Sequence, residues 1–290
     1  MVTLFRTPFV IRLFKLLLFF LCFFVIDRFC HRQTGGFALT KIHSDRPFNP
    51  EWEVAPPTPA EEAEIERALS QPYRFFSYGG QSYVFLSEDG KTVLKFFKHH
   101  HMRPIPLFRE DKLPSFFTSC TLAYRYFKER TALLALHLNK TTHLNKTVTL
   151  IDKLNIAHQI DLDRVDFALQ RRAELPYRRF LRLKKEKNLE AAEKSLHSLL
   201  ELIALRCQKG IYDRDPNIRR NCGFLGDNAI ELDLGSYTYD PLVATPAATR
   251  EILVAQTRKL KHWIQKSYPE LLPYFEMQLS AMLEKNTETF

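Results

Sequence analysis

Residues 210–235 read GIYDRDPNIRRNCGFLGDNAIELDLG. This stretch carries a carboxylate at Asp215, a carboxamide at Asn221 and a second carboxylate at Asp233. Metal-assisted phosphoryl transfer needs such a set, because one group orients the attacking hydroxyl and two oxygen donors hold Mg²⁺. We therefore expect a phosphoryl-transfer site here, and the neighbouring Asp213 is a second candidate for the residue that orients the hydroxyl.

The composition indicates a folded protein. The chain has 290 residues, of which 45% are hydrophobic, and this is enough to bury a core within one two-lobed domain. The formal net charge of +9 is spread along the chain, and the densest basic run, residues 178–187, includes Glu186 and few aromatic side chains. We therefore expect no nucleic-acid partner. The five cysteines form no C-x-x-C pair, which argues against a zinc site or a disulfide scaffold and favours a reducing compartment.

The N-terminus differs from the rest of the chain. Residues 16–26 (LLLFFLCFFVI) form an uncharged apolar run, which approaches a membrane-spanning length when it is extended back to Phe9. No A-x-A cleavage site follows, so we expect residues 1–30 to be a single-pass membrane anchor, with a cleaved signal and a buried helix as alternatives. Basic residues flank both ends equally and do not set the orientation. Residues 31–60 contain five prolines and are predicted to be a linker.

The order of the remaining elements predicts an α+β fold, with strands before residue 171 and mainly helices after residue 172. The Asp89-Gly90 pair predicts a hairpin. The expected elements are, in chain order, a helix at 61–69, strands at 82–86 and 92–97, a helical run from Pro114 to Leu138, a strand pair at 147–160 and 165–171, a helix at 189–209, a short strand at 229–232 and a helix that opens at Thr245-Pro246.

Two motifs in the strand-rich part are typical of phosphate binding. Residues 77–84 (SYGGQSYV) resemble a G-x-G-x-x-G-x-V loop. Gly79, which Gly80 follows, is at the central glycine position and Val84 is at the valine position, while serines stand at the two outer glycine positions. Val93-Leu94-Lys95 follows the Asp-Gly hairpin and resembles the V-A-I-K strand. A lysine that faces a cleft from this strand can neutralise nucleotide phosphates.

Two later motifs complete the set. Residues 213–215 (DRD) resemble the H-R-D triplet with aspartate in place of histidine, and Asn221 falls six residues after Asp215 rather than five. Asp233-Leu234-Gly235 resembles the metal-binding D-F-G. Residues 73–240 therefore resemble the protein-kinase-like superfamily, in a divergent form nearer to small bacterial or aminoglycoside-phosphotransferase-like kinases.

The resemblance implies a two-lobed fold, with a small strand-rich N-lobe at 61–171 and a reduced helical C-lobe at 172–290. It also implies ATP and Mg²⁺ as cofactors. The site residues that it implies are Gly79, Gly80 and Lys95 for the nucleotide, Glu129 for fixing Lys95, Asn221 and Asp233 for Mg²⁺, and Asp215 or Asp213 for the phosphate acceptor.

Three functions remain open at this point. The first is a membrane-tethered, ATP- and Mg²⁺-dependent phosphotransferase of unknown acceptor, whose domain we expect in the cytoplasm because ATP is available there. The second is a pseudokinase-type binding module, because the histidine and the outer glycines are replaced. The third is an unrelated α+β domain. No A-P-E motif follows Gly235 and only 55 residues remain, so we expect no substrate lobe of eukaryotic size.

Overall fold

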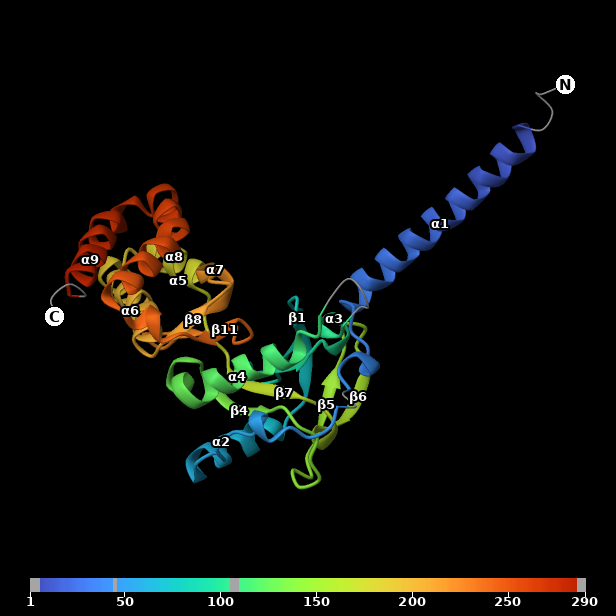
Figure 1. Cartoon of the computed structure of the whole chain (residues 1–290), viewed down its shortest axis with the longest axis horizontal. Coiled ribbons are helices and arrows are strands. Elements are labelled where there is room, and N and C mark those ends of the chain that lie inside the picture. The colour runs from blue at the N-terminus through green and yellow to red at the C-terminus, as the bar shows by residue number, and fades with distance from the viewer. Residues whose placement is uncertain (1–5, 44–45, 105–109, 286–290) are drawn as a thin grey trace.

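The chain folds into a mixed α+β domain from which one long helix projects (Figure 1). A computed structural model describes residues 6–43, 46–104 and 110–285. A seven-stranded sheet makes up one half of the domain, and a group of helices with two short two-stranded sheets makes up the other. The expected α+β class is confirmed.

The projecting helix is α1 (Arg6–Thr34). Its segment Phe9–Thr34 has 26 residues and contains an 18-residue stretch with a mean hydropathy of 2.6, none of which is buried against the domain. The helix is therefore long and apolar enough to cross a membrane. It ends at Gly35 and Gly36, which both adopt positive φ angles and turn the chain back onto the sheet.

The sheet has the strand order β4-β7-β3-β2-β1-β5-β6. Its β1 and β5 strands run parallel, and every other neighbouring pair is antiparallel. The predicted hairpin is confirmed, because β2 and β3 are joined through Gly90 at a φ of 71°. The strands are β1 (Tyr73–Tyr78), β2 (Ser82–Ser87), β3 (Thr92–Phe97), β4 (Leu133–His137), β5 (Thr147–Ile151), β6 (Ala157–Asp161) and β7 (Phe167–Arg171).

Two sequence-based expectations for this half are wrong. The helix expected to reach Leu138 ends at Phe127 as α4 (Leu113–Phe127), and the leucines that follow form β4. The leucine spacing suits a helix, but Ala132 adopts a φ of 55° and pairing with β7 decides the outcome. The expected strand pair at 147–171 is three strands, because β7 inserts between β3 and β4 while β5 and β6 extend the sheet beyond β1.

The helical half is built around α6 (Leu189–Gln208), whose bounds agree with the predicted helix to one residue. The predicted helix start at Thr245 is also confirmed, since the Thr245 hydroxyl accepts a hydrogen bond from the Ala248 N–H. The other elements are α5 (Pro176–Lys185), β8 (Ile211–Asp213), α7 (Ile218–Asn221), β9 (Cys222–Leu225), β10 (Asn228–Glu231), β11 (Tyr237–Tyr239), α8 (Pro246–Ser267) and α9 (Leu272–Lys285). β9 pairs with β10, and β8 with β11.

The segment predicted as a linker packs against the domain. Phe37 and Ile42 are buried in the core beneath the sheet. Trp52 is buried against Phe117 of α4, with ring centroids 4.9 Å apart. The segment then leads into α2 (Pro59–Leu69), which Thr58 caps. The proline-rich segment is therefore irregular, as expected, but it packs along the surface of the domain and is not a free tether.

We expect the structure to tolerate removal of α1 but not of the residues that follow it. Deletion of residues 2–33 removes side chains without core contacts, and we expect a soluble, folded domain. Deletion of residues 2–45 also removes Phe37 and Ile42, each of which contributes about 2–5 kcal/mol by burial. The melting temperatures of the two truncated proteins test this. Equal melting temperatures would show that Phe37 and Ile42 do not contribute to the core.

Glu61 generates a prediction for acid pH. Its carboxylate accepts hydrogen bonds from Lys128 and from the Thr58 N–H, and these lower the pKa of Glu61 to about 2, the Lys128 bond having the larger effect. A lowered carboxylate pKa stabilises the fold above the unfolded pKa of 4.5, and this stabilisation is lost as the pH falls towards 2. We expect Glu61→Gln to lower the free energy of unfolding at neutral pH by about 1 kcal/mol, because the pair lies at the surface.

Urea denaturation from neutral pH to acid pH measures this effect. The difference between Glu61→Gln and the unmodified protein is expected to shrink as the pH falls below about 4. The exposed neighbour Glu62 provides the matched control, Glu62→Gln. A difference that stays constant with pH would contradict the role of the Glu61 carboxylate.

Candidate functional site

Lys95 brings the sheet and the helical half together. It lies on β3 in the middle of the sheet, opposite Val84 on β2 and Ala168 on β7. Its amine donates a hydrogen bond of 2.7 Å to the carbonyl oxygen of Leu232. Burial lowers the pKa of Lys95, and the nearby carboxylate of Asp233 opposes that shift. The structure thus places Lys95 beside Asp233, although the two residues are far apart in the sequence.

The Asp233-Leu234-Gly235 segment is fixed by α4. The Ser119 hydroxyl of α4 donates to the Leu234 carbonyl and accepts a hydrogen bond of 2.6 Å from the Tyr237 N–H. The Asp233 carboxylate accepts from the Gly235 N–H at 3.2 Å. A methyl group on Gly235 would lie 2.1 Å from the ring of Phe116, so only glycine fits here without a shift of α4.

The two candidate aspartates have different surroundings. Asp213 is buried, and its carboxylate accepts hydrogen bonds from the Asp215 N–H at 2.9 Å and from the Ser236 hydroxyl at 2.6 Å. Asp215 is exposed, and no hydrogen bond or ion pair engages its carboxylate within the part of the chain that the structure describes. Asp213 therefore holds the loop together, while the carboxylate of Asp215 is open to an external group.

Asn221 joins this loop to the Asp-Leu-Gly segment. Its side-chain amide donates a hydrogen bond to the Asp215 backbone carbonyl at 2.9 Å. Its backbone carbonyl accepts a hydrogen bond from the Leu232 N–H at 2.6 Å. Leu232 in turn accepts from Lys95. Four of the predicted site residues therefore lie along one continuous path, from Asp215 through Asn221 and Leu232 to Lys95, with Asp233 next to Leu232.

A buried charge cluster lies under this path and was not predicted from the sequence. The guanidinium of Arg206, on α6, pairs with the carboxylate of Glu231 and lies 3.6 Å from that of Asp213. It also donates to the Gln256 side chain at 2.6 Å. Burial raises the pKa of Glu231 against the attraction of Arg206. The cluster fixes the end of β8 relative to the end of β10, and its only sequence signal is a charged residue inside each of two apolar runs.

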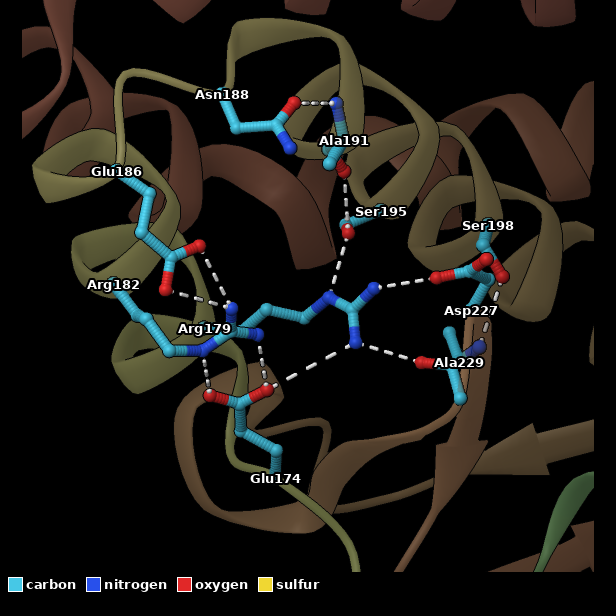
Figure 2. Close-up of polar contacts among 11 residues, drawn as sticks. Glu174, Arg179, Arg182, Glu186, Asn188, Ala191, Ser195, Ser198, Asp227 and Ala229 are labelled. Carbon is cyan, nitrogen blue, oxygen red and sulfur yellow. Dashed lines mark hydrogen bonds and ion pairs between the residues drawn. The ribbon is translucent and has the colours of Figure 1, made fainter.

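A second polar cluster positions the β9–β10 hairpin, as Figure 2 shows. Arg179, on α5, donates to the Ser195 hydroxyl of α6 at 2.7 Å, to the Gly226 carbonyl at 2.6 Å and to the Asp227 carboxylate at 2.8 Å. Ser198 of α6 accepts from the Ala229 N–H at 2.8 Å. These bonds hold β10 on α6, and β10 leads directly into the Asp-Leu-Gly segment.

The Gly79-Gly80 turn joins β1 to β2, and side chains of residues that follow β3 bond its carbonyl groups. The Gly79 carbonyl accepts from the Lys98 amine at 2.7 Å, and the Gly80 carbonyl bonds the His101 ring at 3.0 Å. A methyl group on either glycine would meet no atom within 4 Å. The side chain of the next residue, Gln81, reaches over Gly235. The turn therefore lies at the Asp-Leu-Gly segment and has open space beside both glycines.

Glu129 does not pair with Lys95 in the structure. Because α4 ends at Phe127, Glu129 falls in the following 3₁₀ turn, where it is exposed and pairs with Lys209 at 3.3 Å. The helix α4 contains no acidic residue. It presents Cys120 to Lys95 and Asp233 instead, and burial raises the pKa of the Cys120 thiol well above its ordinary value.

Comparison with known proteins gives no family assignment. No family model and no curated protein matches the chain. Among solved structures, two of the bifunctional kinase-methyltransferase WbdD are each 16% identical, with a TM-score of 0.36, and cover 72% and 75% of this chain. The complex of Rv3197 with erythromycin from Mycobacterium tuberculosis is 14% identical, covers 70% of this chain and 61% of its own, and has a TM-score of 0.27. The chain spans 43–46% of the WbdD chains.

We expect Gly235→Ala to destabilise the domain by about 1–3 kcal/mol, because the added methyl group meets the Phe116 ring and α4 has to move. The matched control is Gly79→Ala, whose methyl group points into open space. In a double-mutant cycle, Phe116→Ala is expected to reduce the cost of Gly235→Ala. Urea denaturation measures the free energy of unfolding of the unmodified protein, the three single variants and the double variant. Strictly additive effects of the Phe116 and Gly235 substitutions would contradict this contact.

Proposed function

We propose that the chain is a membrane-anchored, protein-kinase-like phosphotransferase that uses ATP and Mg²⁺ on an acceptor still to be identified. The observation that carries this proposal is the single path of hydrogen bonds from Asp215 through Asn221 and Leu232 to Lys95. It gathers one cation, one carboxamide and two carboxylates from distant parts of the chain, the set that phosphoryl transfer uses.

Each residue has a proposed role that follows from its surroundings. Lys95 neutralises nucleotide phosphates, and the turn at Gly79 and Gly80 covers them with its backbone. Asp215 orients the acceptor hydroxyl, because its carboxylate is exposed and unengaged among the described residues. Asp213 is a positioning residue, because its carboxylate is already bonded to the Asp215 N–H and to Ser236.

The donors in this site suit Mg²⁺. Asn221 uses its amide nitrogen for the Asp215 carbonyl, and this leaves its amide oxygen for a metal. Asp233 supplies a carboxylate oxygen beside it in the path. Mg²⁺, when bound to these two residues, would neutralise charge on the phosphoryl group. The backbone bond between Asn221 and Leu232 fixes Asn221 relative to Lys95, and Asp233 is fixed by following Leu232 directly in the chain.

A second candidate is a kinase-shaped binding module without catalysis. It is favoured by the lack of any acidic residue on α4, since the lysine of an active kinase is fixed by a glutamate on the corresponding helix. In this chain the amine of Lys95 is bonded to a backbone carbonyl instead. The two candidates both bind a nucleotide, but only the first transfers a phosphoryl group, so one set of variants separates them.

Membrane anchoring is the other part of the proposal. It is supported by α1, because a helix of this length and hydropathy with no buried residue has no apolar partner within the described chain. The apolar face of the helix therefore requires a membrane or the machinery that inserts proteins into one. We further propose that the domain lies on the cytoplasmic side, where ATP is present.

We expect Mg-ATP to raise the melting temperature of the domain that lacks residues 2–33. A ligand that binds only the native state contributes about 2.7 kcal/mol at a hundred times its dissociation constant. Asp233→Asn is expected to remove most of this gain, because it removes a metal ligand. Asp215→Asn is expected to keep the gain and abolish ATP turnover, because Asp215 contacts the acceptor and not the phosphates. Glu190→Gln, at an exposed carboxylate on α6, is the matched control.

The outcomes separate the two candidates. Stabilisation by Mg-ATP with turnover that Asp215→Asn abolishes supports the enzyme. Stabilisation that Asp233→Asn removes, without turnover in any variant, supports the binding module. An unchanged melting temperature across the millimolar range of Mg-ATP contradicts the nucleotide site in both.

A further inference from the structure

The C-terminal end of α1 is fixed to one edge of the sheet. The amine of Lys153, in the turn between β5 and β6, donates a hydrogen bond of 2.6 Å to the Arg32 carbonyl of α1. The ring of His31 lies edge-on to that of Tyr78, at the end of β1, with centroids 5.9 Å apart. Because β1 and β5 are parallel, their C-terminal ends lie at the same edge of the sheet. The end of α1 is therefore held between these two turns.

The length of α1 sets the height of this edge above a membrane. A hydrocarbon core of about 30 Å takes about 20 residues at a rise of 1.5 Å each. The apolar run of α1 ends at Ile26, where a span that starts at Phe9 is long enough to cross the core, so Arg28 lies about 3 Å and Arg32 about 9 Å further along the axis. The headgroup layer on each side of the core is about 5–7 Å thick. Arg28 therefore lies within the headgroup layer, and the turn that bonds Arg32 lies at its outer surface.

The side chains at this edge suit such a position. Three of them are large, apolar or amphipathic, and exposed: Leu154 at 50%, Ile156 at 52% and Tyr78 at 48%. The β5–β6 turn is rigid, because the Asp152 carboxylate accepts hydrogen bonds from the Leu154 N–H at 2.8 Å and the Ile156 N–H at 2.9 Å. The turn therefore presents Leu154 and Ile156 in a fixed direction.

Basic residues surround these apolar side chains. Arg28 and Arg32 lie on the exposed last turns of α1, where Asp27 is the one acidic residue, and the amine of Lys153 is bonded to the Arg32 carbonyl. The one carboxylate in the turn, Asp152, is engaged by backbone N–H groups and by His158. Apolar side chains with cations beside them fit the boundary between acyl chains and anionic headgroups.

We propose that Tyr78, Leu154 and Ile156, together with Arg28, Arg32 and Lys153, form a lipid-docking edge that binds an anionic membrane surface and fixes the orientation of the domain on it. This inference rests on the membrane anchoring proposed for α1 and is independent of ATP binding. A lipid surface is favoured over a protein partner because the edge is continuous with α1, and the span of α1 places it at the outer surface of the headgroup layer. The Gly79-Gly80 turn follows Tyr78 directly, so docking also brings the mouth of the candidate site close to the membrane.

The test uses the full chain in vesicles of phosphatidylcholine and phosphatidylglycerol. Cys22 and Cys30 are exposed and are replaced by serine, while the other three cysteines are buried. An environment-sensitive fluorophore is attached at Ile156→Cys, and in a matched protein at Leu242→Cys. Leu242 is exposed at 70% and lies in the segment between β11 and α8, and Figure 1 shows both of these elements in the helical half, away from α1.

We expect the probe at residue 156 to shift its emission to the blue and to be quenched by lipids that carry a nitroxide on the acyl chain. The probe at residue 242 is expected to show neither effect. Leu154→Asp is expected to weaken the quenching at residue 156 without releasing the protein from vesicles. Omitting phosphatidylglycerol is expected to weaken the quenching too, because it removes the anionic partners of the cations.

Four outcomes would overturn the proposal in distinguishable ways. An unshifted probe at residue 156 on vesicle-bound protein rejects the lipid-docking edge and leaves the anchor intact. Protein that stays in the supernatant rejects the anchor and the edge together. A blue shift without quenching by the nitroxide lipid indicates a protein partner instead of lipid. Equal quenching without phosphatidylglycerol rejects the role of the cations.

Discussion

The hydrogen bond between the Lys95 amine and the Leu232 carbonyl joins the two halves of the domain, and the site depends on it. An ammonium group withdrawn from water is strongly unfavourable unless a carboxylate and hydrogen-bond acceptors replace the water. Here the replacements are Leu232 and Asp233, which come from the helical half, while Lys95 comes from the middle of the sheet. Any movement that separated the halves at this point would leave the amine without a partner, so the sheet and the Asp-Leu-Gly segment are expected to move together.

The helical half has its own fixed points, and they explain why Leu232 and Asp233 are where Lys95 needs them. Arg206 joins the end of β10 to the end of β8 inside the core. Arg179 ties the β9–β10 hairpin to α6 from the other side (Figure 2). Both arginines use several hydrogen bonds in a planar arrangement, which a lysine could not reproduce. The segment that carries Asp233 is thus held at its start by charge clusters and further along by Ser119 of α4.

Local sequence patterns predicted the elements that short-range interactions decide. The Asp-Gly hairpin, the helix after Asn188 and the cap at Thr245 all follow from neighbouring residues. The failures depend on contacts that are distant in sequence. Leu133–His137 became a strand because β7 was available for pairing, and that also removed Glu129 from the helix that faces Lys95. In the candidate site, the order of Asp215, Asn221 and Asp233 drew attention to this segment of the chain, but nothing local pointed to Arg206 as the group beneath it.

Cys120 is the residue that α4 presents to Lys95, and this affects how the proposed ligands would bind. With no acidic residue on α4, Asp233 is the one carboxylate whose charge acts on the Lys95 amine among the described residues. In the proposed function, Asp233 would share its charge with a bound Mg²⁺, and the Leu232 carbonyl would then be the main partner left to the Lys95 amine. Phosphate oxygens of a bound nucleotide would offset this loss, because they would bring negative charge to Lys95. Under the proposed function, metal and nucleotide binding would therefore be coupled through Lys95, and we expect the metal–nucleotide complex to bind better, relative to either component alone, than it would at a site with a second carboxylate.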